Sequence, residues 1–217
     1  MLSETSCKTR VAVLVSGGGT NLQALIDAGA RGELPQVEFA LVVSSTADAY
    51  ALERAKKAGI PTLVIERRGK KRETFTRLLC EALQEAQIDL VVFAGFMVIL
   101  SPLFFEVFEN RAMNVHPALI PSFCGEGYYG LHVHEQALAY GVKMTGATVH
   151  FATAVTDGGP IILQKAIQVL EDDTPEILQR RVMEQCEWVI LPQAVRLFSE
   201  GRLRVEGRIV RIREEER

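Results

Sequence analysis

The sequence predicts an α/β protein in which helices cover both faces of a mostly parallel sheet. Short runs of β-branched and aliphatic residues, such as 11–15 and 90–97, alternate with segments whose apolar residues recur at helical spacing. This alternation is typical of a parallel sheet that is buried on both faces. Hydrophobic residues make up 48% of the 217-residue chain, which is enough for one substantial core.

The first part of the chain alternates strands and helices at short intervals. The run at 11–15 ends in glycines, and the apolar residues that follow predict a helix. We expect a second strand at 37–44, a helix at 49–58, and a third strand at 62–65. The charged segment that comes next leads into an amphipathic helix.

The second part contains strands, a glycine-rich loop and a long helix. Strands are predicted at 90–97, 143–151 and 161–169, and the run 113–121 reads as a strand that ends in a loop. A loop at 123–130 precedes a helix at 134–140, Pro192 should kink or split a helix at 177–197, and 203–212 reads as a hairpin. Together these elements predict a single three-layer, Rossmann-like domain over residues 1–217. Its core spans about 11–203, and a C-terminal helix is followed by a hairpin and tail at 203–217.

Composition excludes several functional classes. A formal net charge of −3 without a dense basic stripe argues against nucleic acid as a partner. The N-terminal residues lack a secretory apolar region, and the run at 11–15 is too short to cross a bilayer, so we expect a cytoplasmic protein without membrane contact. The four cysteines form no C-x-x-C pair, which predicts reduced thiols and no metal site; they are Cys7, Cys80, Cys124 and Cys186.

The glycine turn at 16–21 is a candidate phosphate site. Glycines allow the backbone to approach an anion, and the following helix offers unpaired N–H groups and the positive end of its dipole. The run is neither G-x-G-x-x-G nor a nucleotide P-loop, so it gives little support to a dinucleotide or ATP. A tight turn without a ligand is the alternative.

Asn114 and His116 lie two residues apart at the end of a predicted strand, so their side chains leave the same face. An amide can donate to a developing oxyanion while an imidazole transfers a proton, which suits acyl or formyl transfer. The alternative is a strand edge whose polar groups only satisfy neighbouring backbone. The loops that begin at Ser16, Gly95 and His116 all follow strands, so a parallel topology brings them to one sheet edge.

Several motifs together give the chain a family resemblance. They are SGGGTNLQALI, DLVVFAGFMVILSP, MNVHPALIPSF, GATVHF with TDGGPIILQ, and EWVILPQAVRLFSEGRL. In this order they make the chain resemble the folate-dependent phosphoribosylglycinamide formyltransferases from about residue 11 to 203. The resemblance implies that 10-formyltetrahydrofolate donates its formyl group to the amine of glycinamide ribonucleotide during purine biosynthesis. It implies small-molecule substrates, a monomer or homodimer, and no metal.

The resemblance also implies site residues. Asn114 would face the oxyanion, His116 would transfer the proton, and Asp157 would keep His116 protonated and position a water. The family's phosphate loop falls on Gly19, Thr20 and Asn21, and the acid on the ribose side falls on Glu187, with Glu184 as an alternative. The implied folate contacts, besides Asn114, are Arg72, Met97, Val98, Ile99, Leu100, Thr153, Ala154, Val155, Thr156 and Asp157.

Some positions depart from the family or remain open. Val98 stands where relatives often carry arginine, which would remove a salt bridge to the folate tail. His150 is expected to pack or support the site, whereas His132 and His134 are expected to face solvent or cap their helix. The rival activity is that of a formyltetrahydrofolate hydrolase, in which water replaces the amine.

Overall fold

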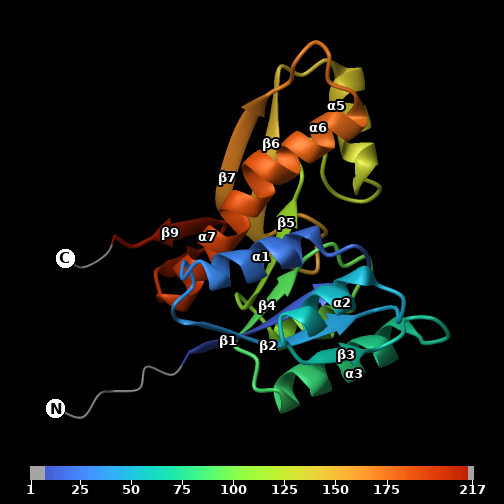
Figure 1. Ribbon diagram of the computed structural model, residues 1–217, viewed down its shortest axis with the longest axis vertical. Helices are drawn as coiled ribbons and strands as arrows, with labels where there is room; N and C mark the ends of the chain where they lie inside the picture. The colour runs from blue at the N-terminus through green and yellow to red at the C-terminus, as the bar shows by residue number, and fades with distance from the viewer. Residues whose placement is uncertain (1–7, 215–217) are drawn as a thin grey trace.

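The computed structural model describes residues 8–214, so Cys7 and the last three residues of the tail lie outside the described residues. Within residues 8–214, all strands belong to one nine-stranded sheet, in the order β3-β2-β1-β4-β5-β6-β7-β9-β8. Figure 1 shows the sheet running through the molecule, with helices packed against it. The strands are β1 (Thr9–Val15), β2 (Val37–Ser44), β3 (Thr62–Val64), β4 (Leu90–Phe93), β5 (Ala112–His116), β6 (Met144–Phe151), β7 (Ile161–Gln168), β8 (Leu203–Glu206) and β9 (Ile209–Ile212).

The first five strands of this order are parallel, and β6 then runs antiparallel to both of its neighbours. The helices are α1 (Thr20–Ala30), α2 (Tyr50–Lys57), α3 (Arg72–Glu85), α4 (Pro102–Val107), α5 (Leu131–Tyr140), α6 (Pro175–Val182) and α7 (Trp188–Ser199). Sequence periodicity did not predict α4, because six residues are too few to show a helical repeat.

Alternation along β1 explains the three layers. Val11, Val13 and Val15 pack into the core under α1, α6 and α7, whereas Ala12 and Leu14 pack into the core under α3 and α4. Successive side chains of a strand point to opposite faces, so a strand that is apolar on both faces must be covered twice. The predicted α/β fold with a mostly parallel sheet is confirmed.

Two predicted elements were wrong in detail. The strand expected at 90–97 ends at Phe93, because the chain turns at Gly95, whose φ is 71°. The long helix at 177–197 does break, but not at Pro192, which lies inside α7. The break is a π turn, η1 (Met183–Glu187), which is a wider helical turn with an extra residue.

Within residues 8–214, no helix is long and apolar enough to cross a membrane. The same residues contain no cluster of three or more His, Cys, Asp or Glu side chains with the spacing of a metal site. The three described cysteines, Cys80, Cys124 and Cys186, are free thiols.

The sequence suggested that His134 faces solvent or caps its helix. Instead its side chain is buried in α5, where the residue is 1% exposed. Among the described residues neither of its ring nitrogens has a hydrogen-bond partner. Burial, and secondarily the charge of His116, lower the pKa of His134 from 6.5 to about 4. Helical periodicity alone did not reveal this, although the neighbouring Val133 is buried as well.

We expect His134 to make folding weaker in acid. Its folded pKa lies below the unfolded value, so the unfolded chain binds more protons between pH 6.5 and 4. Its stabilising contribution is complete above pH 6.5 and falls by up to about 3 kcal/mol as the pH approaches 4. Urea unfolding of His134→Gln should show a smaller loss of stability over this range than the wild type. His132→Gln, on the same helix but half exposed, should behave like the wild type; an equal flattening in both would contradict the assignment.

Candidate active site

The glycine turn connects β1 to α1 and rests on α2. Gly19 has a φ of 73°, and a Cβ atom there would lie 2.6 Å from the Cβ of Ala51. The Ala51 N–H donates to the Gly17 carbonyl at 3.0 Å, and Arg54 Nε donates to the Gly18 carbonyl at 2.8 Å. The carbonyls of Gly17 and Gly18 therefore point to α2, and the first N–H groups of α1 have no partner within the helix.

A cavity of about 280 Å³ lies beside this turn, lined by Gly17, Gly18, Gly19, Thr20, Asn21, Ala94 and Gly95. The cavity sits between the carboxyl ends of β1 and β4. The strand order reverses there, since β2 flanks β1 on one side and β4 on the other. Ligands of open α/β sheets bind at such switch points, and a helix N-terminus favours an anion.

Replacing Gly19 by alanine should disturb this turn. The new Cβ would collide with Ala51 in a left-handed backbone conformation, so we expect a loss of roughly 1–3 kcal/mol in unfolding free energy. Gly18→Ala is the matched control, because a Cβ there meets nothing within 4 Å. Thermal unfolding of both variants checks this, and equal melting temperatures would contradict the predicted strain.

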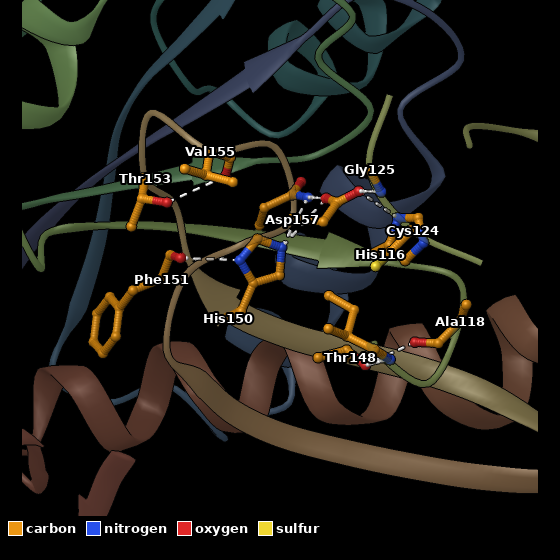
Figure 2. Close-up of polar contacts among 12 residues, drawn as sticks. His116, Ala118, Cys124, Gly125, Thr148, His150, Phe151, Thr153, Val155 and Asp157 are labelled. Carbon is orange, nitrogen blue, oxygen red and sulfur yellow. Dashed lines mark hydrogen bonds and ion pairs between the residues drawn. The ribbon is translucent and has the colours of Figure 1, made fainter. Parts of the chain in front are cut away.

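Asn114, His116 and Asp157 lie together in the structure. Figure 2 shows His116 and Asp157 facing each other. His116 Nδ1 is 3.5 Å from Asp157 Oδ2, and Asn114 Nδ2 is 3.5 Å from Asp157 Oδ1. The side chains of His116 and Asp157 are only 5% and 7% exposed. The sequence thus predicted three residues that the fold brings into contact, although they are separated by up to 43 positions.

The backbone around Asp157 fixes its orientation. Asp157 adopts a φ of 52°, and a Cβ at Gly159 would lie 1.7 Å from the Phe151 carbonyl oxygen. The chain therefore passes too close to β6 for any side chain at that position. On the other side of the site, Thr148 Oγ1 donates to the Ala118 carbonyl at 2.7 Å and accepts from the Ile120 N–H, which anchors the loop after His116.

The loop at 123–130 contacts two of these residues, His116 and Asp157, through its backbone. The Phe123 carbonyl is 2.8 Å from His116 Nε2, and the Gly125 N–H donates to Asp157 Oδ2 at 2.9 Å. Since a carbonyl only accepts, His116 Nε2 carries a proton in this arrangement. Backbone contacts of this kind carry no sequence signature, and sequence reasoning therefore missed them.

His150 is a fourth side chain of the cluster. Its Nε2 is 3.5 Å from Asp157 Oδ1 and 3.4 Å from Asn114 Nδ2, while Nδ1 is 2.9 Å from the Phe151 carbonyl. The residue is 2% exposed on β6. These contacts agree with the expectation that His150 packs against the site or supports it. Asn114 and His150 are neighbours because the antiparallel register of β5 and β6 pairs them.

Charges in the cluster are set by burial and by close partners. Burial alone would raise the pKa of Asp157, but the contacts with His150, His116 and the Gly125 N–H lower it below its usual value. Burial lowers the pKa of His116 and outweighs the opposing effects of Asp157 and the Phe123 carbonyl. The contact with Asp157 favours the imidazolium form of His116, as the resemblance implied, but burial opposes it and has the larger effect on the pKa.

Glu187 lies next to the glycine turn in space. Asn21 Nδ2 donates to Glu187 Oε2 at 2.8 Å, across 166 positions of sequence. Glu187 is 6% exposed, and its burial raises the pKa of the carboxyl to about 7. Glu184, the alternative acid, is exposed to solvent.

The expected folate residues are more dispersed. Met97 donates its N–H to Ser16 Oγ at 2.9 Å, which ties that segment to the glycine turn. Met97, Ile99 and Val155 are exposed, whereas Leu100 is buried and Val98 packs against the same core. Thr153 Oγ1 donates to the Val155 carbonyl within the loop that carries Ala154 and Thr156.

Arg72 makes no hydrogen bond or ion pair with Asn114, His116 or Asp157 among the described residues. It begins α3, its side chain is half exposed, and it pairs with Glu73 at 3.5 Å. Its turn of helix is linked to the end of the folate segment, because Thr76 Oγ1 donates to the Arg72 carbonyl and accepts from the Ser101 N–H. These two bonds fix the start of α3 relative to the segment that ends at Ser101.

Comparison with known proteins agrees with this geometry. The model of a family described as formyl transferase matches residues 9–195. The phosphoribosylglycinamide formyltransferase of Escherichia coli is 42% identical over 196 residues, which cover 90% of this chain and 89% of that protein. The chain belongs to the formyl transferase family.

Other relatives show how far the likeness extends. The trifunctional purine biosynthetic protein adenosine-3 of Bos taurus is 43% identical over 96% of this chain, but the chain spans only 20% of that protein. The structure of glycinamide ribonucleotide transformylase 1 from Symbiobacterium toebii has a TM-score of 0.90 at 45% identity and covers 99% of this chain and 98% of its own. A formyltetrahydrofolate deformylase from Pseudomonas syringae has a TM-score of 0.86 at 27% identity, covering 95% of this chain and 66% of its own.

Proposed function

We propose that the protein transfers the formyl group of 10-formyltetrahydrofolate to the amine of N1-(5-phospho-D-ribosyl)glycinamide. The products are the N2-formyl ribonucleotide and tetrahydrofolate, in purine biosynthesis. The observation that carries the proposal is the pairing of Asn114, His116 and Asp157 with a glycine turn on the same sheet edge. One group of residues suits formyl chemistry, and the other suits a phosphorylated acceptor.

In the proposed reaction the amine nitrogen attacks the formyl carbon and forms a new C–N bond. The formyl oxygen becomes an oxyanion, which the Asn114 amide stabilises by donating a hydrogen bond; one such donor contributes about 3 kcal/mol. The amine proton passes to the neutral His116, directly or through water. Because Nε2 already carries a proton, Nδ1 receives it, and the Asp157 carboxylate stabilises the resulting imidazolium.

The intermediate then collapses. The bond between the formyl carbon and the folate nitrogen breaks, the oxyanion returns to a carbonyl, and the folate nitrogen takes up a proton. His116 is the group that supplies it, so the protein ends the cycle in its starting protonation state. His150 contacts both Asp157 and Asn114, and therefore holds the acid and the amide at the distance that this cycle needs.

The substrates are assigned to two parts of the site. The ribonucleotide phosphate binds at Gly19, Thr20 and Asn21. The Glu187 carboxyl accepts hydrogen bonds from the ribose side of the same substrate. The folate lies against Met97, Val98, Ile99 and Leu100 and against the loop that carries Thr153, Ala154, Val155, Thr156 and Asp157, with Arg72 at its edge and Asn114 at the formyl group. Exposed apolar side chains at Met97, Ile99 and Val155 suit the flat rings of a folate.

We further propose that the chain acts as one formyltransferase domain over residues 1–217, with the hairpin of β8 and β9 as an appendage. It is a cytoplasmic enzyme, a monomer or homodimer, that uses small-molecule substrates and needs no nucleic acid, membrane or metal.

A hydrolase that releases formate is the second candidate, since a deformylase shares this fold. The glycine turn, with its cavity and its contact with Glu187, favours the transferase, because hydrolysis has no phosphorylated acceptor to bind. The two are separated by following tetrahydrofolate release with and without the ribonucleotide. We expect release only when both substrates are present. Equal release without the ribonucleotide would establish hydrolysis.

A further inference from the structure

Glu187 owes its buried position to the π turn before α7. The buried stripe of α6 contains Leu178 and Val182. In an uninterrupted α-helix, Gln185 and Val189 would continue that stripe. Instead Gln185 and Val189 are exposed, and the residues buried in η1 and early in α7 are Cys186, Glu187, Ile190 and Leu191. The wide turn therefore shifts the inward face by one residue and turns Glu187 inward.

Asn21 is the partner that Glu187 meets there. Asn21 lines the cavity of the glycine turn, and its Nδ2 donates to Glu187 Oε2 at 2.8 Å. Within residues 8–214, the other end of the amide, Oδ1, is buried without a hydrogen-bond partner. An unpaired buried acceptor weakens folding, so this asparagine is poorly explained as a stabilising contact.

We propose that the side chain of Asn21 is a positioning group that, together with the π turn, holds the Glu187 carboxyl ready for the ribose side of the ribonucleotide. The inference rests on the proposed function and assigns separate roles to the backbone and the side chain of Asn21. Its backbone N–H belongs to the phosphate subsite, and its side chain serves the ribose subsite. The side-chain amide of Asn21 donates through Nδ2 to Glu187 Oε2 and leaves the other carboxyl oxygen to accept a hydrogen bond from the substrate.

Binding without turnover tests this division. Calorimetry in the absence of folate gives the Kd of glycinamide ribonucleotide, and a titration with inorganic phosphate probes the phosphate subsite alone. In Asn21→Ala the backbone N–H remains, so we expect the ribonucleotide Kd to rise about tenfold, the effect of one hydrogen bond. The Kd of inorganic phosphate should change less than about twofold. Glu184→Gln, an exposed acid of the same π turn, is the matched control and should bind both probes like the wild type.

Each other outcome counts against the inference. An unchanged ribonucleotide Kd in Asn21→Ala would show that its side chain has no positioning effect. Equal weakening for ribonucleotide and phosphate would place its effect in the phosphate subsite. Failure of the wild type to bind the ribonucleotide, while it still binds phosphate, would overturn the proposed function along with this inference.

The pH dependence of binding separates positioning from a merely structural effect. The carboxyl of Glu187 ionises near pH 7, because burial raises its pKa, and the Asn21 bond opposes that rise. A carboxylate accepts ribose hydroxyls better than a carboxylic acid does, so affinity should increase as the pH rises through 7. Asn21→Ala should move this increase to higher pH. Glu187→Gln keeps a side-chain oxygen that accepts hydrogen bonds but cannot ionise, so it should abolish the part of the pH dependence that comes from Glu187. A profile that stays unshifted in Asn21→Ala would contradict the inference.

Discussion

Asp157→Asn should lower kcat by roughly 10²–10⁴-fold while leaving ribonucleotide binding almost unchanged. The carboxylate faces His116 Nδ1, His150 Nε2 and the Gly125 N–H at 2.9–3.5 Å. His116 Nδ1 and the Gly125 N–H share one carboxylate oxygen, Oδ2, which an amide oxygen could replace, but a neutral amide has no negative charge with which to stabilise an imidazolium. The glycine turn lies elsewhere on the sheet edge and should keep its affinity.

Single-turnover kinetics and equilibrium binding check this prediction together. Asp172→Asn, an exposed acid outside the site, is the control for the substitution itself and should retain wild-type values. If Asp157→Asn kept full turnover, Asp157 would have no part in the reaction. If it lost turnover and ribonucleotide binding to the same degree, the substitution would have disturbed the site as a whole.

His116→Ala should also reduce kcat by roughly 10²–10⁴-fold, because the amine proton loses its acceptor. The pH profile of the wild type gives an independent view of the same residue. Burial lowers the pKa of His116 below its ordinary 6.5, and the proposed reaction uses the neutral imidazole as the proton acceptor. The midpoint of the loss of kcat in acid should therefore lie below pH 6.5.

The control for this variant is His132→Ala, whose ring is half exposed on α5 and pairs with Glu135. Its kcat and its pH profile should match those of the wild type. An acid limb centred above 6.5 would indicate that Asp157 raises the pKa of His116 more strongly than burial lowers it. If His116→Ala kept more than a tenth of wild-type activity, the imidazole of His116 would not be the proton acceptor.

The sheet and its active edge were predictable because they depend on local pattern and chain connectivity. Alternation of apolar strands and helices specifies a parallel sheet, and a parallel sheet places the residues after β1, β4 and β5 at one edge. Asn114 and His116 share a strand, so their common direction follows from the period of two. These inferences need no knowledge of long-range contacts.

The features that sequence reasoning missed depend on register and burial. The presence of proline placed the predicted break at Pro192, whereas the π turn at Met183–Glu187, which adds one residue to a helical repeat, has no such residue to mark it. The pKa of His116 depends on burial, which the identity of its neighbour does not reveal. The position of His150 follows from the antiparallel pairing of β5 with β6, which a mostly parallel pattern did not predict.

The fate of the formyl carbon tests the proposed function most directly. Purified protein would receive 10-formyltetrahydrofolate labelled with ¹³C in the formyl group, with unlabelled glycinamide ribonucleotide, and the products would be followed by NMR. We predict that the label appears in the formamide of the ribonucleotide, in proportion to the tetrahydrofolate released. Recovery of the label as formate, at a rate that does not depend on the ribonucleotide, would contradict the assignment of this protein as a formyl-transferring enzyme.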